Sequence, residues 1–340
     1  GSGNNARNIY IGNNLIDAGH PTTNGGAYYA ISVYGLNSTN YGTDSIYIVN
    51  NELRNFYYYG IYAYYAGDLF IKGNNIHKST KTATTTNYGI YSYYTSGEIT
   101  GNRVHSLSPL VPTNTNSQYG IYTAYMSNSA TYGKRRFDIT NNVVYNVGNS
   151  GTFYGIYAGY GDSAYVAHNT VHVNVGTGTS TSTQYGIYVI NTTNSYQVRN
   201  NNVTFERGNN GTKYGIYAST STMFNTNLGL QNNNVFMNSS RTGTQHRAYY
   251  GGAARATLAV FQAAFPTLEV NGIEADPMYL NVATGDLTPT NQLVIMQGED
   301  LTAIIPKDIQ NYTRPVPPTP GAFDLSPEFW NNAGAVQLNA

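Results

Sequence analysis

The chain has 340 residues with 17 basic and 17 acidic side chains, so its formal net charge is zero, and it contains no cysteine. This balance gives no attraction toward nucleic acid or an anionic membrane surface. The missing thiols exclude disulfides, thiolate metal sites and cysteine nucleophiles. Because no apolar run reaches the length of a membrane span, we also expect no membrane insertion.

The N-terminus begins with Gly1-Ser2-Gly3, which is typical of a vector-derived remnant. A strand-like segment follows at residues 8–11, and no signal peptide lies between the two. We therefore interpret residues 1–7 as this remnant plus an incomplete N-terminus. We therefore expect the chain to be a fragment of a longer protein, with any export signal and the N-terminal cap missing.

A four-residue motif, Tyr-Gly-Ile-Tyr, returns along most of the chain. Its copies begin 29 to 35 residues apart, with a weaker first copy at Tyr29, and the full copies start at Tyr59, Tyr88, Tyr119, Tyr154, Tyr185 and Tyr214. A fixed period of this size indicates a stacked repeat architecture. Long apolar stripes of helical period are absent from residues 8–250, which argues against helical repeats.

A second motif alternates with the first: a short apolar alternation, then Asn, then a β-branched residue or Leu in most copies. Its copies contain Asn13, Asn50, Asn74, Asn102, Asn141, Asn169, Asn201 and Asn233. Asn tolerates left-handed backbone, so it suits a sharp corner between two strands. Identical Asn residues stacked on each other can also pair their side-chain amides in a ladder. Each period then contains one strand at the Tyr motif, one that ends at Asn and one after the Asn corner. Three short strands per period predict a β-solenoid.

These two motifs together resemble the right-handed parallel β-helix repeat of the pectate-lyase-like superfamily. The resemblance implies an all-β fold of about eight coils over residues 8–252. It says little about activity, because lyases, hydrolases, epimerases and non-enzymatic surface proteins share this fold. The lyases use a Lys, Arg, His or Tyr base, commonly with Ca²⁺ held by carboxylates, and the hydrolases use clustered Asp.

Residues 253–340 differ in character from the repeats. Residues 255–265 have helical spacing of apolar residues, and Pro266 ends them. The motifs after them resemble the C-terminal cap of secreted Bacteroidetes β-helix proteins, with Asn311 where Gly is usual; they are Asp276-Pro277, Gly285-Asp286-Leu287, Arg314-Pro315 and Gly321-Ala322-Phe323-Asp324. We expect this segment to cover the open hydrophobic end of the solenoid.

Strict alternation along the first strand of a coil places Ile61 and Ala63 in the core and Gly60, Tyr62 and Tyr64 outside. The expected outer face is then a strip of Tyr beside Gly, with a further partial ladder at Tyr65, Tyr94, Tyr125 and Tyr160. Its candidate ligand-binding residues are Tyr62, Tyr64, Tyr91, Tyr93, Tyr122, Tyr157, Tyr188 and Tyr217. Two interpretations stay open: a platform on which sugar rings stack, and a ladder that only stabilises neighbouring strands.

Candidate metal ligands lie away from this strip. Asp68 and Glu98 follow the first strand on adjacent coils and could hold Ca²⁺, but solvated turn charges are the favoured interpretation. His77 and His105 stand at equivalent positions on adjacent coils, where a shared metal or outward-facing strand residues are the alternatives. The next equivalent position is Val144, before a third histidine. Otherwise no cofactor is expected, and the catalytic residues stay unassigned.

Three functions fit the sequence. The first is a non-catalytic module on the outer surface of a bacterium or in its surroundings, which binds extracellular polysaccharide or another surface protein through the Tyr/Gly strip. The second is a polysaccharide lyase or related enzyme, for which the longest break in the repeat, residues 125–138, is the candidate site. The third is a purely structural solenoid in a surface assembly. We favour the first because the six full repeats place no Asp, Glu, Lys or Arg on the strip.

Overall fold

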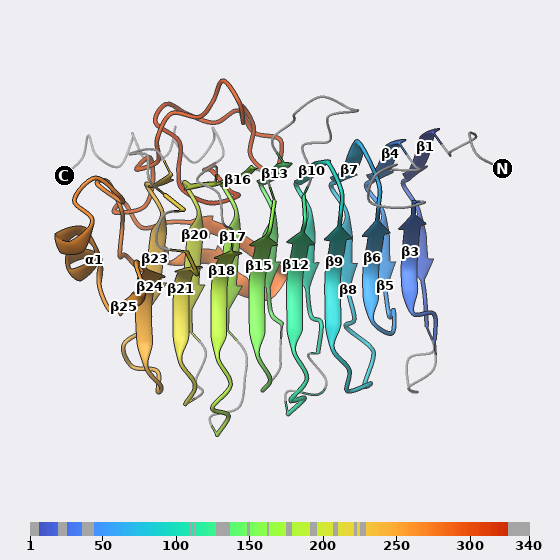
Figure 1. The fold of residues 1–340 in the computed structure, drawn as a ribbon, viewed down its shortest axis with the longest axis horizontal. Helices are drawn as coiled ribbons and strands as arrows, with labels where there is room; N and C mark the ends of the chain where they lie inside the picture. Colours follow the sequence, from blue (N-terminus) through green and yellow to red (C-terminus); the bar gives the residue numbers. More distant parts are fainter. Residues whose placement is uncertain are drawn as a thin grey trace, which may run out of the picture.

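The computed structural model describes residues 7–19, 26–35, 44–108, 111, 113–126, 137–147, 150–161, 163–174, 179–190, 196–206, 210–220, 223–224 and 229–325. In these residues the chain contributes one strand to sheet A, one to sheet B and one to sheet C, and then repeats this order. Each such set of three strands is one coil of the solenoid. Consecutive strands of one sheet therefore come from successive coils (Figure 1). The predicted class, an all-β parallel solenoid, is confirmed.

The strands are short and nearly all parallel. Sheet A contains β1 (Arg7–Gly12), β4 (Asp44–Val49), β7 (Leu69–Lys72), β10 (Gly97–Thr100), β13 (Phe137–Thr140), β16 (Ala164–Ala167), β19 (Tyr196–Arg199) and β22 (Leu230–Gln231). Sheet B contains β2 (Leu15–Asp17), β5 (Glu52–Arg54), β8 (Asn75–His77), β11 (Arg103–His105), β14 (Val143–Tyr145), β17 (Thr170–Val173), β20 (Asn202–Phe205) and β23 (Asn234–Met237). Sheet C contains β3 (Tyr29–Tyr34), β6 (Tyr59–Tyr64), β9 (Asn87–Tyr93), β12 (Gln118–Ala124), β15 (Phe153–Gly159), β18 (Gln184–Ile190), β21 (Lys213–Ala218), β24 (Gln245–Tyr250) and, antiparallel to β24, β25 (Ala253–Arg255).

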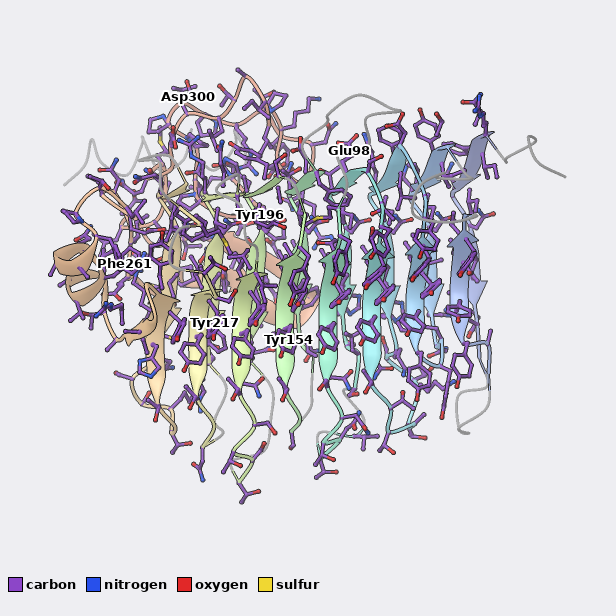
Figure 2. The ribbon with its side chains drawn as sticks, in the orientation of Figure 1. Glu98, Tyr154, Tyr196, Tyr217, Phe261 and Asp300 are labelled. Atoms are coloured by element: carbon purple, nitrogen blue, oxygen red, sulfur yellow. The ribbon has the colours of Figure 1, made fainter. Side chains whose placement is uncertain are left out.

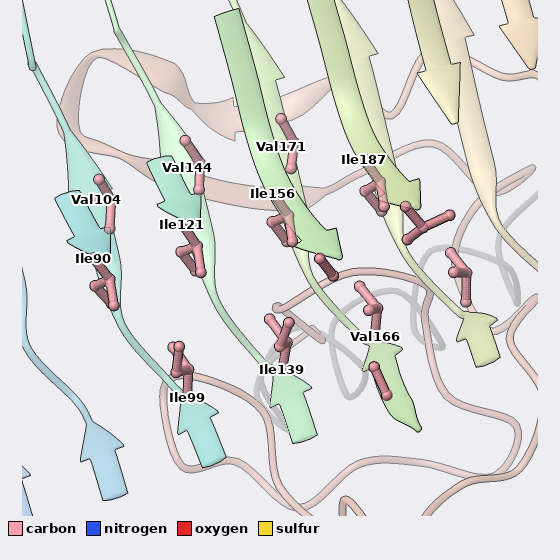
Figure 3. Packing of buried hydrophobic residues seen from close by; sticks show 14 of the residues in the cluster. Ile90, Ile99, Val104, Ile121, Ile139, Val144, Ile156, Val166, Val171 and Ile187 are labelled. Atoms are coloured by element: carbon pink, nitrogen blue, oxygen red, sulfur yellow. The ribbon is translucent and has the colours of Figure 1, made fainter. Parts of the chain in front are cut away.

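Equivalent apolar side chains from the three sheets fill the core. The isoleucines of the repeated motif pair in register from coil to coil and are buried; they are Ile31, Ile61, Ile90, Ile121, Ile156, Ile187 and Ile216. Figure 3 shows part of this column facing valines of sheet B and branched residues of sheet A. Burying each such side chain contributes roughly 1.5–3 kcal/mol. The prediction that the Ile column forms the core is confirmed.

An asparagine ladder, buried except at its N-terminal member, runs along the corner between sheets A and B. Its members are Asn14, Asn51, Asn74, Asn102, Asn142, Asn169, Asn201 and Asn233. Asn102 is representative: its backbone N–H and its Nδ2 both donate to Asn142 Oδ1 at 3.0 Å. Its Nδ2 also donates to Ile71 O at 2.9 Å, which ties the corner to sheet A. The predicted amide ladder is thus confirmed.

The residue before each ladder asparagine has left-handed backbone, with φ of 53° at Asn50 and 68° at Gly101. This conformation turns the chain from sheet A to sheet B. At the C-terminal end, Glu269 replaces the next asparagine and accepts hydrogen bonds from the backbone N–H and Nδ2 of Asn233. Arg247 Nη2 lies 2.9 Å from the buried Glu269 carboxylate, so the ladder ends on an ion pair.

The glycine of the repeated motif faces the core, which corrects the expected Tyr/Gly strip. A Cβ on Gly120 would lie 2.5 Å from Val144 Cγ1 in sheet B and 2.5 Å from Gly155 O on the next coil. Gly60 and Ile61 are both buried, so alternation breaks between Tyr59 and Tyr62. Only a residue without a side chain lets sheets B and C approach this closely.

The C-terminal segment covers more than the end of the solenoid. The predicted helix exists as α1 (Leu258–Ala264), and its buried Phe261 packs near Tyr250 over the last coil. The following β26 (Tyr279–Asn281), η1 (Val282–Thr284) and β27 (Asp286–Pro289) lie along sheet B instead. The expectation of an end cap therefore holds for α1 and for the residues up to Ala275, which contact the last coil, but not for the residues from β26 onward.

Beyond β27 the chain follows the corner between sheets A and B of the later coils. Two residues with left-handed backbone at this corner form hydrogen bonds with the segment. Asn141 Nδ2 donates to Lys307 O at 2.8 Å, and Asn200 Nδ2 donates to Glu299 O at 2.7 Å. Arg314, which is buried, pairs with Asp324 and donates to Asn141 Oδ1 at 2.6 Å. In Figure 1 this orange-red segment lies above β13 and β16, and it leaves sheet C uncovered.

Candidate ligand-binding face

The outer face of sheet C carries columns of tyrosine, which we call the tyrosine face. The first column consists of Tyr29, Tyr59, Tyr88, Tyr119, Tyr154, Tyr185 and Tyr214. The second column consists of Tyr62, Tyr91, Tyr122, Tyr157, Tyr188, Tyr217 and Tyr249. Figure 2 shows these rings lined up across the strands, with Tyr154 and Tyr217 labelled.

Rings stack within a column and stand nearly perpendicular between columns. Tyr91 and Tyr122 are parallel within 4° at a centroid distance of 4.9 Å, whereas Tyr119 and Tyr122 form an angle of 90°. Carbon atoms in contact lie about 3.5–4.0 Å apart, so parallel rings at this larger centroid distance must be offset. Tyr62, Tyr91 and Tyr122 are half-buried, so each keeps part of its surface toward solvent.

Two further columns widen the face on the earlier coils. The third contains Tyr34, Tyr64 and Tyr93, and the register continues it with Ala124, Gly159 and Ile190. The fourth, the partial ladder predicted near the turn, contains Tyr65, Tyr94, Tyr125 and Tyr160. The two columns meet at right angles, with 82° between the rings of Tyr64 and Tyr65 and of Tyr93 and Tyr94.

The tyrosine face is neutral. Among the described residues of the parallel strands of sheet C, from β3 to β24, the only charged side chains of Asp, Glu, Lys or Arg are Lys213 and Arg247, and both are buried. Burial, followed by the neighbouring phenols, raises the pKa of Tyr62, Tyr185 and Tyr188 to about 12. These hydroxyls therefore stay protonated at neutral pH, where they can donate and accept hydrogen bonds.

Every tyrosine chosen from the sequence lies on this face, but the first column was missed. Strict alternation assigned Tyr59 and its equivalents to the inner side, and the inward glycine reverses that assignment. The available signal was the motif itself, since Tyr precedes Gly in all six full copies. A position that faces the core in every repeat is expected to be apolar. A buried Tyr would instead need a hydrogen-bond partner for its hydroxyl in each coil.

The two candidate histidines stack instead of converging. The rings of His77 and His105 are 4.9 Å apart, and the residue paired with His105 on the next coil is Tyr145, which corrects the expected Val144. The ring nitrogens of His105 bond Ser106 Oγ and Asn75 Oδ1, both at 3.0 Å. Burial, then His77 and Arg103, lowers the pKa of His105 to about 4.

The two candidate carboxylates are not paired with each other by the strand register. Glu98 pairs in register with Phe70, two residues beyond Asp68, and forms an ion pair with Lys72. The backbone N–H of Asp68 donates to Ser96 Oγ at 2.9 Å. The register therefore does not place Asp68 and Glu98 at equivalent positions. Residues 127–136, most of the break at 125–138, lie outside the described residues.

A perturbed lysine that the sequence did not suggest lies beneath the edge of the face. Lys78 is fully buried and donates to Tyr57 O at 3.1 Å and to Asn87 Oδ1. Burial, with Lys81 nearby, lowers the pKa of Lys78 to about 7. Because solvent does not reach its amine, the arrangement supports the loop that carries Tyr57 and does not present a base to a ligand.

These features define a parallel β-solenoid with one continuous, uncharged tyrosine face. Comparison with protein-family models, curated proteins and solved structures gives no match. The likeness to the pectate-lyase-like superfamily and to Bacteroidetes caps accordingly rests on the sequence motifs alone. Where the chain is described, it holds no helix of the length and apolarity that a membrane crossing requires, and no group of three His, Asp or Glu placed to hold a metal.

Proposed function

We propose that the protein is a non-catalytic module that binds an extended polysaccharide on its tyrosine face, at or outside the surface of a bacterial cell. The observation that carries this proposal is the pair of adjoining tyrosine columns, stacked from β6 to β21 without interruption. Aromatic rings with solvent-facing hydroxyls combine an apolar surface for sugar C–H groups with hydrogen-bonding partners for sugar hydroxyls.

The geometry favours a neutral, extended glycan that lies along the solenoid. Successive rings of the second column are 4.5 to 5.2 Å apart, which is close to the length of one sugar residue in an extended β-linked chain. Among the described residues of the face, no Lys or Arg is placed to pair with a uronate or sulfate group. A chain lying along the columns therefore meets equivalent contacts on each coil.

Affinity electrophoresis tests this proposal with soluble mixed-linkage β-glucan, xyloglucan and glucomannan, and with polygalacturonate as the charged comparator. We expect the neutral glycans to retard the protein and polygalacturonate not to. The triple variant Tyr62→Ala, Tyr91→Ala, Tyr122→Ala should weaken retardation about tenfold or more, because each lost ring removes roughly 0.5–1.5 kcal/mol. Tyr47→Ala is the matched control, since Tyr47 stacks on Phe70 at 4.7 Å in sheet A.

Two results would contradict the proposal. If the triple variant is retarded as strongly as wild type, the tyrosine face is not the binding site. If no glycan retards the wild-type protein, the ligand is not one of these polysaccharides. Unsaturated products released from polygalacturonate with Ca²⁺ would favour the lyase alternative. Concentration-dependent dimers that the triple variant abolishes would instead make the face a contact between protein chains.

A further inference from the structure

The fourth tyrosine column adopts a backbone conformation that its residues disfavour. Tyr65, Tyr94, Tyr125 and Tyr160 have φ of 55°, 51°, 51° and 53°. In this left-handed region the Cβ of a bulky residue crowds the backbone, so Gly and Asn are the usual occupants. Four successive coils therefore each place a tyrosine where it costs free energy.

The other corner of the same solenoid shows the ordinary solution. Between sheets A and B, seven of the eight left-handed residues are Asn or Gly; the positions are Asn13, Asn50, Gly73, Gly101, Asn141, His168, Asn200 and Asn232. On the coils of β6, β9, β12 and β15 the corner after sheet C has the same left-handed backbone, yet the residue there is tyrosine. The turn itself therefore does not require a tyrosine ring, and the ring must contribute something else.

The rings build a structure at the edge of the tyrosine face. Within the fourth column, centroids are 5.2, 4.8 and 5.1 Å apart, and Tyr160 is 42% exposed. Tyr64 and Tyr93 stand at 82° to their neighbours in this column. We call these six residues the corner shelf, which comprises Tyr64, Tyr65, Tyr93, Tyr94, Tyr125 and Tyr160.

We propose that the corner shelf is the principal glycan contact and that it grips one edge of a neutral, unbranched chain. Two perpendicular rows of rings can contact a sugar on its face and on its edge, which a single flat column cannot do. Backbone strain kept at one place is typical of ligand clamps. This inference rests on the proposed function and locates its binding on coils β6 to β15.

The test uses the quadruple variant Tyr65→Asn, Tyr94→Asn, Tyr125→Asn, Tyr160→Asn. Asn suits left-handed backbone, so the thermal midpoint should stay unchanged or rise. Affinity for the neutral glycan that retards the wild-type protein most should fall about tenfold or more, at least as much as in the variant of Tyr62, Tyr91 and Tyr122. Tyr47→Asn removes a stacked ring from sheet A and serves as the matched control.

The outcomes separate this inference from the proposed function. If wild type is retarded and the quadruple variant binds within about threefold of it, the corner shelf is not the principal contact while the face can still be the site. A large fall in the thermal midpoint, with the affinity of the still-folded variant unchanged below that midpoint, would show that the rings serve the fold, and it would overturn the inference. Should the quadruple variant not fold, Tyr160→Asn alone must weaken binding at an unchanged midpoint. No retardation of wild type would overturn both proposals.

Discussion

The asparagine ladder and the tyrosine columns are built alike but treat their polar atoms in opposite ways. Both stack identical residues one coil apart, roughly 4.8 Å, along the solenoid. In the ladder, Asn102 directs Nδ2 and Oδ1 to other residues of the protein and is fully buried. In the columns, Tyr91 shares its ring faces with its neighbours and is only half-buried. One stack joins the coils inside the protein, and the other leaves a surface that is partly exposed to solvent.

The two stacks also end differently. The ladder needs a hydrogen-bond acceptor after Asn233, and the buried Glu269 supplies it with Arg247 as counterion. Burial raises the pKa of Glu269, against the opposing effects of Arg247 and Asn233. The first tyrosine column instead ends on the ring of His246, stacked 5.2 Å from Tyr214. A buried polar ladder must be terminated, whereas an exposed aromatic column can simply stop.

The largest expected effect comes from breaking the ladder in its middle with Asn102→Ala. The variant removes the acceptor of Asn74 N–H and Asn74 Nδ2, which donate to Asn102 Oδ1 at 3.0 and 2.9 Å. Each buried group left without a partner costs about 1–3 kcal/mol, so we expect a loss of roughly 3–5 kcal/mol. Urea unfolding followed by circular dichroism measures it.

The matched control for this variant is Asn14→Ala at the exposed N-terminal end of the ladder. Asn14 is exposed, and its Nδ2 donates to Asn51 Oδ1 at 2.9 Å with no earlier coil depending on it among the described residues. Its loss should cost about 1 kcal/mol or less. Equal losses for Asn14→Ala and Asn102→Ala would show that the ladder does not hold the coils together.

The next effect in size tests the direction of the motif glycine. In Gly120→Ala the new Cβ meets Val144 Cγ1 and Gly155 O at 2.5 Å, contacts that backbone and core must move to relieve. We expect a loss of about 2–4 kcal/mol, since overpacking of this kind typically costs 1–3 kcal/mol and here includes backbone. Tyr122→Ala, two residues further on the outer face, should cost less. Thermal unfolding compares the two variants. If Gly120→Ala leaves the stability unchanged, the glycine does not face the core.

Much of the fold could be predicted because a stacked repeat transmits one pattern to every coil. The period, the Ile core and the Asn ladder need only the spacing of residue types. The outward direction of Tyr59 could not be obtained from alternation, since it depends on how closely sheet B approaches Gly60. Distances between sheets are set by packing, which no single strand encodes.

The prediction that Val144 follows His105 was wrong because it used the wrong register. Counting three residues from the first Asn of a pair selected Val144, but the ladder uses the second residue of Asn141-Asn142, so Tyr145 follows His105. Similarly, the motifs after residue 275 predicted a cap without showing that it folds back along sheet B. That path depends on contacts across more than 150 residues, such as Arg103 with Gly285.

The smallest expected effect is a loss of stability at alkaline pH. It distinguishes the tyrosine columns from the asparagine ladder, because Tyr side chains ionise and Asn side chains do not. The pKa of Tyr62, Tyr185 and Tyr188 is raised to about 12 from the ordinary value of 10.0. The folded state therefore binds these protons more tightly than the unfolded state, and the resulting stability is complete below pH 10 and lost as pH rises toward 12. After allowance for solvent screening of these half-exposed rings, each contributes at most about 1 kcal/mol.

The variant Tyr62→Phe, Tyr185→Phe, Tyr188→Phe keeps the stacked rings and removes the ionisable hydroxyls. We expect its thermal midpoint to match that of wild type at neutral pH and to fall less between about pH 10 and 12, while phenolate absorbance of the wild type rises over the same interval. The asparagine ladder is identical in both proteins and does not titrate, so it cannot produce the difference. Identical alkaline losses would mean that ionisation of these three phenols is not coupled to folding, and that their protons are held no more tightly on the tyrosine face than in the unfolded chain.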